Sequence, residues 1–234
     1  MLGSREPMPT LQTFDDTTKI GASWLSRVEK ALIHHVTPKV PQWIHSTHLV
    51  LVSLPISLAI IFFSYLARHQ THWLWVVSLL IIVQWVTDSL DGAVGRYRKE
   101  GLVKWGYYMD HLFDYFFLCS VLIGYSLLTT NQHPVAQFFV LALCGGYMVN
   151  SFLVFGATQE FRMVHLGFGP TEMRLLFILL NTLIIIFGKT YIAPALPFAL
   201  VLCFLGLCVI IYRTQKDLWM RDMEEKRQKE LRNS

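Results

Sequence analysis

Six long apolar segments limit what this chain can fold into. Each has about 17–25 residues, which is the length an α-helix needs to cross the hydrocarbon core of a bilayer. Backbone polar groups inside a bilayer must be satisfied within the protein, so isolated apolar segments of this length are expected to be helices. We place the spans at residues 46–67, 72–94, 106–130, 134–157, 172–189 and 191–212.

The composition supports a membrane protein rather than a soluble one. Of the 234 residues, 53% are hydrophobic and only 15% are charged, more apolar surface than a soluble domain of this length can bury. We predict an all-α integral membrane protein with one six-helix domain at 46–212, an N-terminal arm at 1–45 and a charged tail at 213–234. The four cysteines lie in apolar segments, so we interpret them as small buried residues rather than disulfide partners or metal ligands: Cys119, Cys144, Cys203 and Cys208.

The basic residues predict the orientation of the spans. If the N-terminus is cytoplasmic, all but two of the 20 lysines and arginines fall on the cytoplasmic side, and only Arg68 and Lys189 fall outside. This asymmetry predicts that both termini are cytoplasmic. The first twenty residues are polar and lack an apolar core segment, so we expect no cleavable signal peptide.

The N-terminal arm contains one amphipathic segment. Apolar residues recur at helical spacing between Trp24 and Val36, with Arg27, Glu29 and Lys30 among them. This pattern predicts a helix that lies in the cytoplasmic membrane interface, and a soluble arm is the alternative. The tail is predicted to be a solvated helix of mixed charge.

Four aspartates stand at the ends of two predicted spans. Asp88 and Asp91 are three residues apart near the end of the second span, and Asp110 and Asp114 are four apart near the start of the third. Each pair therefore shares one helical face, and the short loop between the spans allows the two faces to meet. Four carboxylates in one place repel one another unless cations lie among them, and oxygen ligands suit a hard divalent ion.

Glycines and an arginine accompany the aspartates. Gly106 precedes Asp110 by one helical turn, and Gly92 and Gly95 follow Asp91. Glycine allows a bulky phosphate or a neighbouring backbone to come close, and the planar guanidinium of Arg96 suits phosphate oxygens.

Two simpler interpretations stay open at this point. The aspartates could pair with Arg96, Arg98 and Lys104 at the membrane surface and do nothing else, although four carboxylates in two helical pairs favour a functional site. The chain could also be a small transporter or a membrane scaffold. Aspartates near one face rather than at the midplane argue against transport.

The spacing of these residues resembles the signature of the CDP-alcohol phosphotransferase family, also called CDP-alcohol phosphatidyltransferases, and reads here Asp88-x2-Asp91-Gly92-x2-Gly95-Arg96-x9-Gly106-x3-Asp110-x3-Asp114. One position departs from the family, which usually has alanine where this chain has Gly95. The segment that enters the first span is a weaker match, because Ser46, Thr47 and Val50 replace the usual Pro, Asn and Thr.

The resemblance implies transfer of a substituted phosphate from a CDP-linked donor to an alcohol, with release of CMP. It implies two divalent cations, Mg²⁺ or Mn²⁺, and a homodimer that binds no nucleic acid. The implied metal ligands are Asp88, Asp91, Asp110 and Asp114, of which Asp114 is also the general base. The implied nucleotide and phosphate contacts come from Asp88, Gly92, Arg96 and Gly106. His111, between the last two aspartates, is interpreted as a packing residue because it points to a different helical face.

The alcohol acceptor is not decided by the sequence. The loop at 156–174 offers Arg162, His165 and Arg174 for a phosphorylated acceptor, and Glu172 for a cationic one. The segment "GPTE" within it also reads simply as a helix start. The compact six-helix size resembles family members that use CDP-diacylglycerol and a small water-soluble alcohol. The alternative is a CDP-choline or CDP-ethanolamine type of enzyme with a lipid acceptor.

Overall fold

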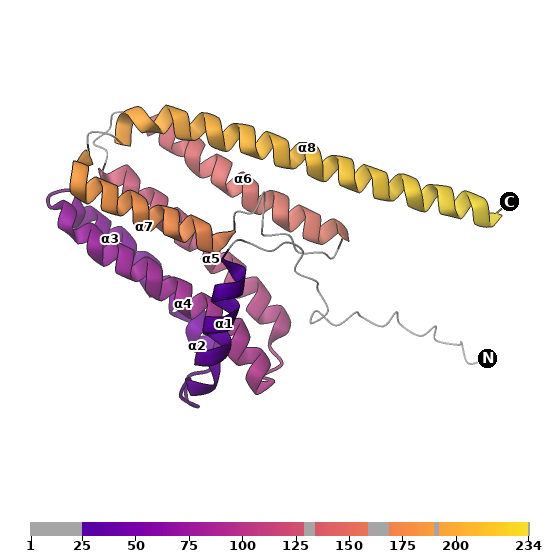
Figure 1. The fold of residues 1–234 in the computed structure, drawn as a ribbon, viewed down its shortest axis with the longest axis horizontal. Helices are drawn as coiled ribbons and strands as arrows, with labels where there is room; N and C mark the ends of the chain where they lie inside the picture. The colour runs from indigo at the N-terminus through magenta and orange to yellow at the C-terminus, as the bar shows by residue number, and fades with distance from the viewer. Residues whose placement is uncertain (1–24, 129–133, 159–168, 190–191, 234) are drawn as a thin grey trace, which may run out of the picture.

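The computed structural model describes residues 25–128, 134–158, 169–189 and 192–233, and this part of the chain is built from helices (Figure 1). The α-helices in chain order are α1 (Ser26–Val36), α2 (Ser46–Leu51), α3 (Ser53–Ala67), α4 (Leu74–Arg98), α5 (Val103–Leu128), α6 (Pro134–Thr158), α7 (Pro170–Phe187) and α8 (Ile192–Asn233). Two short 3₁₀ turns, η2 (Thr37–Lys39) and η3 (Thr71–Trp73), precede α2 and α4.

Six segments of the described residues are long and apolar enough to cross a membrane: Ser46–Ala67, Thr71–Arg98, Val103–Leu128, Val135–Thr158, Pro170–Phe187 and Pro194–Arg232. They confirm the predicted all-α integral membrane fold with six transmembrane helices. The second span runs further than the predicted end at 94, because α4 continues to Arg98. The helix stops there because the next residue, Lys99, has a left-handed backbone with φ 55°, and the Glu100 amide then donates to the Gly95 carbonyl at 3.0 Å.

The first and last spans differ in detail from the prediction. The first is divided at Val52 into α2 and α3, and Pro55, which has no N–H to donate, lies in the first turn of α3. The last helix continues past 212, because α8 is one helix of 42 residues that includes the tail, which confirms the helix predicted there. The stretch 213–233 contains no Gly or Pro and is rich in Glu, Lys and Arg, so nothing in it interrupts the helix.

The core lies where α3, α4, α5 and α7 meet. Its buried members include Ile60, Ile81, Phe117, Val121 and Ile184. In Figure 1, α6 and α8 run side by side at the edge of this group, where α6 also contacts α5, and both bury a much smaller share of their length. Large apolar side chains such as those of Phe198 and Leu202 are exposed on α8, as expected for surfaces whose solvent is lipid.

A polar network joins three of the core helices. Asn181 of α7 is fully buried, and its side-chain amide donates to the Ser78 hydroxyl of α4 at 3.1 Å. Its oxygen accepts a hydrogen bond from the Tyr125 hydroxyl of α5 at 3.0 Å. Buried polar groups of this kind need partners inside a membrane protein, so the network fixes how α4, α5 and α7 are placed around the site.

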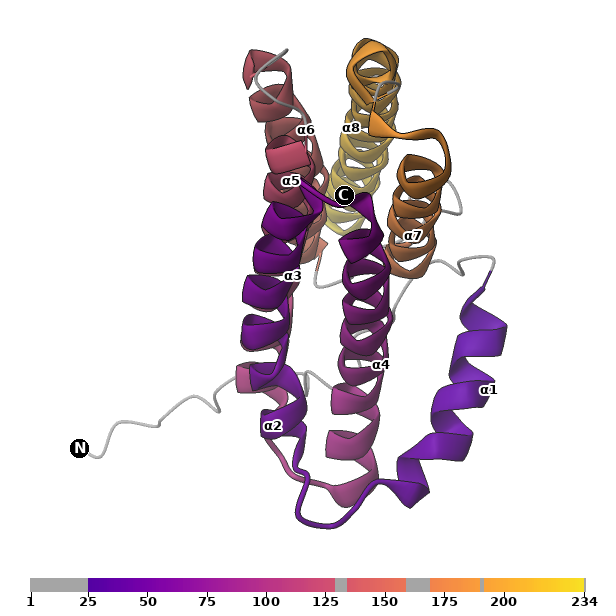
Figure 2. The same cartoon turned by 90° about the vertical axis from the view of Figure 1, so that its left-hand side faces the viewer.

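Helix α1 confirms the helix predicted in the N-terminal arm, and it lies along α4 (Figure 2). Its Glu29 carboxylate accepts hydrogen bonds from Ser89 of α4 at 3.0 Å and from Thr171 of α7 at 2.8 Å. Apolar side chains of α1 and α4 line a pocket between the two helices: Leu32, Ile33, Val36, Trp85, Val86 and Leu90. The position of α1 in the membrane interface stays a prediction, and Trp24 lies outside the described residues.

The four cysteines form no disulfide, as predicted, but they are less buried than expected. Cys119, Cys144 and Cys203 are partly buried, and Cys208 is exposed on α8. Cys144 on α6 and Cys203 and Cys208 on α8 belong to the two spans that bury the smallest share of their length.

Candidate active site

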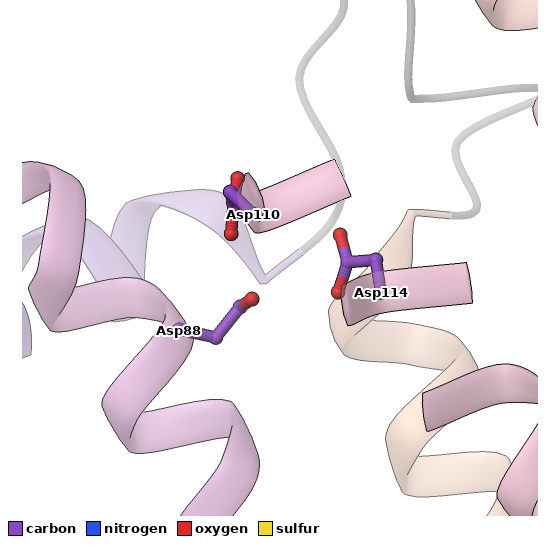
Figure 3. Close-up of side chains that lie close together, drawn as sticks. All are labelled: Asp88, Asp110 and Asp114. Carbon is purple, nitrogen blue, oxygen red and sulfur yellow. The ribbon is translucent and has the colours of Figure 1, made fainter. Parts of the chain in front are cut away.

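Three of the four aspartates converge where α4 and α5 approach each other. Asp88 of α4 and Asp110 and Asp114 of α5 each offer a carboxylate oxygen, and these oxygens all lie within 4.8 Å of one another (Figure 3). We call these three residues the aspartate cluster. Asp110 and Asp114 share a helical face because they are one turn apart, as the sequence predicted. The three side chains keep 12–29% of their surface exposed, so a ligand has access to them.

Asp91 is placed differently from the other three. Its residue is buried, with 6% exposure, and its carboxylate accepts a hydrogen bond from the amide of the adjacent Gly92. The group of oxygens within 4.8 Å of one another does not include it. Its role as a metal ligand stays a prediction.

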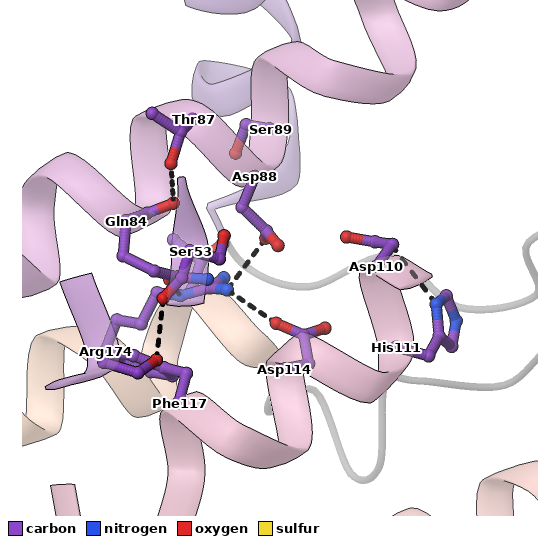
Figure 4. Close-up of polar contacts among 12 residues, drawn as sticks. Ser53, Gln84, Thr87, Asp88, Ser89, Asp110, His111, Asp114, Phe117 and Arg174 are labelled. Carbon is purple, nitrogen blue, oxygen red and sulfur yellow. Dashed lines mark hydrogen bonds and ion pairs between the residues drawn. The ribbon is translucent and has the colours of Figure 1, made fainter. Parts of the chain in front are cut away.

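Arg174 of α7 reaches into the aspartate cluster. One terminal nitrogen of its guanidinium, Nη2, donates to Asp88 Oδ2 at 2.8 Å and to Asp114 Oδ1 at 3.1 Å (Figure 4). Its Nε donates to Gln84 Oε1 at 2.9 Å, and the guanidinium lies 5.5 Å from the centre of the Phe117 ring. The sequence assigned Arg174 to an acceptor-binding surface, but the structure places it, 5% exposed, among the aspartates.

The start of α7 holds Arg174 in this position. Pro170 is the first residue of the helix, and Glu172 Oε2 accepts a hydrogen bond from the Gly169 amide at 2.9 Å. Glu172 Oε1 accepts from the Leu25 amide at 3.2 Å, so the carboxylate also anchors the start of α1. These contacts support the interpretation of "GPTE" as a helix start, and we leave Glu172 out of the proposed acceptor site.

The two other acceptor candidates, Arg162 and His165, lie outside the described residues.

Comparison with known protein families identifies the family of this chain. The sequence model of the CDP-alcohol phosphatidyltransferase family matches residues 40–212 of the chain. The chain belongs to the CDP-alcohol phosphatidyltransferase family. No curated protein matches the chain significantly. Membership makes this chain one of a family of membrane transferases of phospholipid synthesis, which use a CDP-alcohol donor and an alcohol acceptor and generally depend on a divalent metal.

The glycines of the CDP-alcohol phosphatidyltransferase signature are placed beside the cluster. Asp88, Gly92 and Arg96 follow one another at intervals of one helical turn on α4. A Cβ atom at Gly92 would lie 3.2 Å from Nη1 of Arg96, so the guanidinium lies close over this glycine. A Cβ atom at Gly106 would meet nothing within 4 Å, which leaves open space one turn before Asp110.

Arg96 is exposed and forms no ion pair with any residue in the described part of the chain. It is therefore available to an anion from solution.

The end of α4 and the loop that follows it are anchored to the start of α2 and to the residues just before it. The Arg98 guanidinium donates to the carbonyl of Val40 at 2.8 Å and to that of Ile44. The Glu100 carboxylate accepts hydrogen bonds from the Ser46 amide at 3.1 Å and from the His45 ring at 3.2 Å. Burial would raise the pKa of Glu100, but the hydrogen bonds from Ser46 and His45 outweigh it and lower the pKa.

These contacts argue against the interpretation that the aspartates only pair with nearby basic residues at the membrane surface. Within the described part of the chain, no ion pair joins Arg96, Arg98 or Lys104 to the four aspartates, whereas Arg174 pairs with Asp88 and Asp114. Ser46, where the match to the family pattern is weak, binds Glu100.

His111 lies next to the cluster and packs between aromatic rings. Its ring centre is 4.3 Å from that of Tyr107 and 5.8 Å from that of Phe152. Its Nδ1 is 3.2 Å from Asp110 Oδ2 (Figure 4). The packing interpretation therefore fits, but the contact with Asp110 was not foreseen.

Gln84 was missed altogether by the sequence analysis. It is fully buried, and it lies one turn before Asp88 on α4. A polar side chain at that spacing, within an otherwise apolar segment, was the signal that could have revealed it.

Proposed function

We propose that this protein transfers a phosphatidyl group from CDP-diacylglycerol to a small alcohol and releases CMP. The observation that supports this most directly is the convergence of Asp88, Asp110 and Asp114 from two helices, with Arg96 and open space beside Gly106 nearby. The compact six-helix size favours a lipid on the donor rather than on the acceptor.

The aspartate cluster fits a divalent cation. Two of its three carboxylates, those of Asp88 and Asp114, share a single guanidinium, that of Arg174. Carboxylate oxygens are the ligands that Mg²⁺ prefers. We propose that the cluster, together with Asp91, holds two ions, Mg²⁺ or Mn²⁺. When bound, the ions supply charge neutralisation for the pyrophosphate of the donor and for the CMP that leaves.

The side chains of the chain itself provide the remaining steps. Arg96 holds the phosphates of the donor through its planar fork, and Gly92 and Gly106 let them approach the backbones of α4 and α5. Asp114 accepts the proton of the acceptor hydroxyl. The hydroxyl oxygen then forms a bond to the phosphatidyl phosphorus, and the bond from that phosphorus to the CMP oxygen breaks.

We also propose the placement and assembly of the enzyme. The basic residues concentrate on the side that carries the aspartate cluster, which supports cytoplasmic termini and a cytoplasmic active site. Family likeness supports a homodimer. The boundaries 1–45, 46–212 and 213–234 stay a proposal, and the family match at residues 40–212 is consistent with the central one.

A panel of substrates tests the proposed reaction. Purified protein is supplied with CDP-diacylglycerol, CDP-choline or CDP-ethanolamine, each with glycerol phosphate, inositol phosphate, choline or a diacylglycerol, and CMP release is measured. We expect release from CDP-diacylglycerol with a water-soluble alcohol. Release only from CDP-choline or CDP-ethanolamine with diacylglycerol would establish the alternative, in which the lipid is the acceptor rather than part of the donor. Folded protein that releases no CMP from any donor would support a scaffold or transporter.

The same assay tests the dependence on metal. Excess EDTA should abolish CMP release, and Mg²⁺ or Mn²⁺ added above the chelator should restore it, because the carboxylates need a cation to bind an anionic donor. Full activity in excess EDTA would contradict the metal-dependent mechanism.

A further inference from the structure

Arg174 binds carboxylate oxygens that a metal ion in the aspartate cluster would also bind. Its Nη2 contacts one carboxylate oxygen from each of the two aspartate helices, at 2.8 Å on Asp88 and 3.1 Å on Asp114. We infer that Arg174 is a built-in counter-ion of the aspartate cluster, which competes with the divalent cation for Asp88 and Asp114 and thereby weakens metal binding. The inference rests on the proposed metal-dependent function.

The surroundings of Arg174 show that this contact is more than a surface ion pair. The residue is 5% exposed, so water cannot replace its partners. Gln84, which is fully buried, turns its oxygen toward the Arg174 Nε at 2.9 Å. The amide nitrogen of Gln84 finds no hydrogen-bond partner among the described residues, so the orientation of this amide serves Arg174 alone. A charge held in this way is fixed in place before any ligand arrives.

Arg174 also explains how the cluster stays together without metal. Asp88 and Asp114 would repel each other at this separation, and the guanidinium from a third helix, α7, neutralises part of their charge. A divalent cation that binds the same two oxygens must displace Arg174 or share them with it. Either outcome costs metal affinity, because one positive charge leaves its partners or stays beside another.

A purely structural role for Arg174 predicts the opposite effect on metal binding. If Arg174 only gathers the carboxylates, its removal lets them separate, and metal affinity falls. If it competes with the metal, its removal raises metal affinity even though the metal-free protein becomes less stable. The sign of the change in affinity therefore separates the two roles.

Titration of Mn²⁺ into detergent-purified protein measures that sign. Calorimetry would compare wild type with Arg174→Gln, and Lys104→Gln would serve as the matched control, because Lys104 is an exposed cation near the start of α5. We expect the Mn²⁺ dissociation constant to fall roughly tenfold in Arg174→Gln, as one opposing unit charge is removed from the site, and to stay within about twofold in Lys104→Gln. Thermal unfolding should show a lower metal-free Tm for Arg174→Gln and a larger rise in Tm on addition of Mn²⁺.

Equal or weaker Mn²⁺ binding by folded Arg174→Gln, while wild type binds, would overturn the inference and leave the proposed function standing. Absence of Mn²⁺ binding in both proteins would overturn the proposed metal site, and the inference with it. If Arg174→Gln does not fold, Arg174→Lys carries the test. Its ammonium lacks the planar fork that bonds both carboxylates and Gln84 together, so Mn²⁺ affinity should rise about twofold to fivefold. An unchanged or lower affinity would overturn the inference.

Discussion

Asp114 is placed to bind metal and also to accept a proton, and substitutions can separate these tasks. Asp114→Asn keeps the size and one coordinating oxygen but cannot act as a base. We expect this variant to bind Mn²⁺ and the CDP donor nearly normally, with turnover lowered by ~10²–10⁴-fold. Asp88→Asn should instead lose metal affinity and, through it, donor affinity. Mn²⁺ and donor titrations, combined with single-turnover rates, measure both effects.

Two results would contradict this division of roles. Wild-type turnover in Asp114→Asn would place the base elsewhere, and His111, which contacts Asp110, would be the next candidate. Loss of Mn²⁺ as severe as in Asp88→Asn would make Asp114 chiefly a ligand, with the proton leaving through water.

Glu100 should make the stability of the protein depend on pH in the acid range. Its pKa in the folded protein is lowered from the ordinary value of 4.5, despite burial, by hydrogen bonds from Ser46 and His45. A carboxyl group with a lowered pKa stabilises the folded state above its unfolded pKa, and this contribution disappears as the pH falls through the folded value. We expect the Tm difference between wild type and Glu100→Gln to be constant above about pH 5 and to shrink below pH 4.5. A difference that does not change between pH 6 and pH 3, in thermal unfolding in detergent, would contradict this.

At the scale of the helices, we expect alanine substitutions at two glycines to have different effects on stability. On α5, a Cβ atom at Gly124 would lie 2.5 Å from the Ser64 hydroxyl oxygen and 2.9 Å from the Ser64 Cβ, and Ser64 is buried on α3. At Gly95, where the family signature usually has alanine, a Cβ atom would lie 3.5 Å from the Ser46 Cβ, which is ordinary contact. We expect Gly124→Ala to destabilise the protein by about 1–3 kcal/mol. Gly95→Ala should be neutral, or stabilise α4 by up to ~1 kcal/mol.

Thermal unfolding of the two variants in the same detergent tests these predictions. Ser64→Gly, added to Gly124→Ala, should restore much of the lost stability, because it removes both atoms that the new methyl group would meet. A Tm for Gly124→Ala equal to that of wild type would show that α3 and α5 can move apart without cost.

The helices could be predicted from the sequence because lipid imposes a simple rule on them. Long apolar segments had to become spanning helices, and a strict spacing placed Asp110 and Asp114 on one face. The position of Arg174 could not be predicted in the same way. It depends on how α7 packs against α4 and α5, and helical periodicity carries no information about which distant helix is the neighbour. The helix in the tail was predicted, but the pattern did not show that it would join the last span as the single helix α8.

At the scale of the whole molecule, the proposed orientation can be tested by chemical labelling. Gln70, between the first two spans, and Gln228, in the tail, are both exposed. In a background in which the four native cysteines are replaced by serine, a membrane-impermeant maleimide should label Gln70→Cys in intact cells. It should label Gln228→Cys only after permeabilisation, because the basic residues are predicted to stay in the cytoplasm. The reverse pattern would invert the topology and place the aspartate cluster on the outer side.

The continuous helix α8 is a rod of known length. Its 42 residues correspond to about 63 Å at 1.5 Å per residue, roughly twice the thickness of the hydrocarbon core. A fluorophore attached at Lys229 would stand about 24 Å along the helix axis from Arg213. Energy transfer from such a probe to dyes in the lipid headgroups would therefore report the angle between this rod and the membrane plane, since a rod that lies flat brings the probe to the surface and an upright one holds it away.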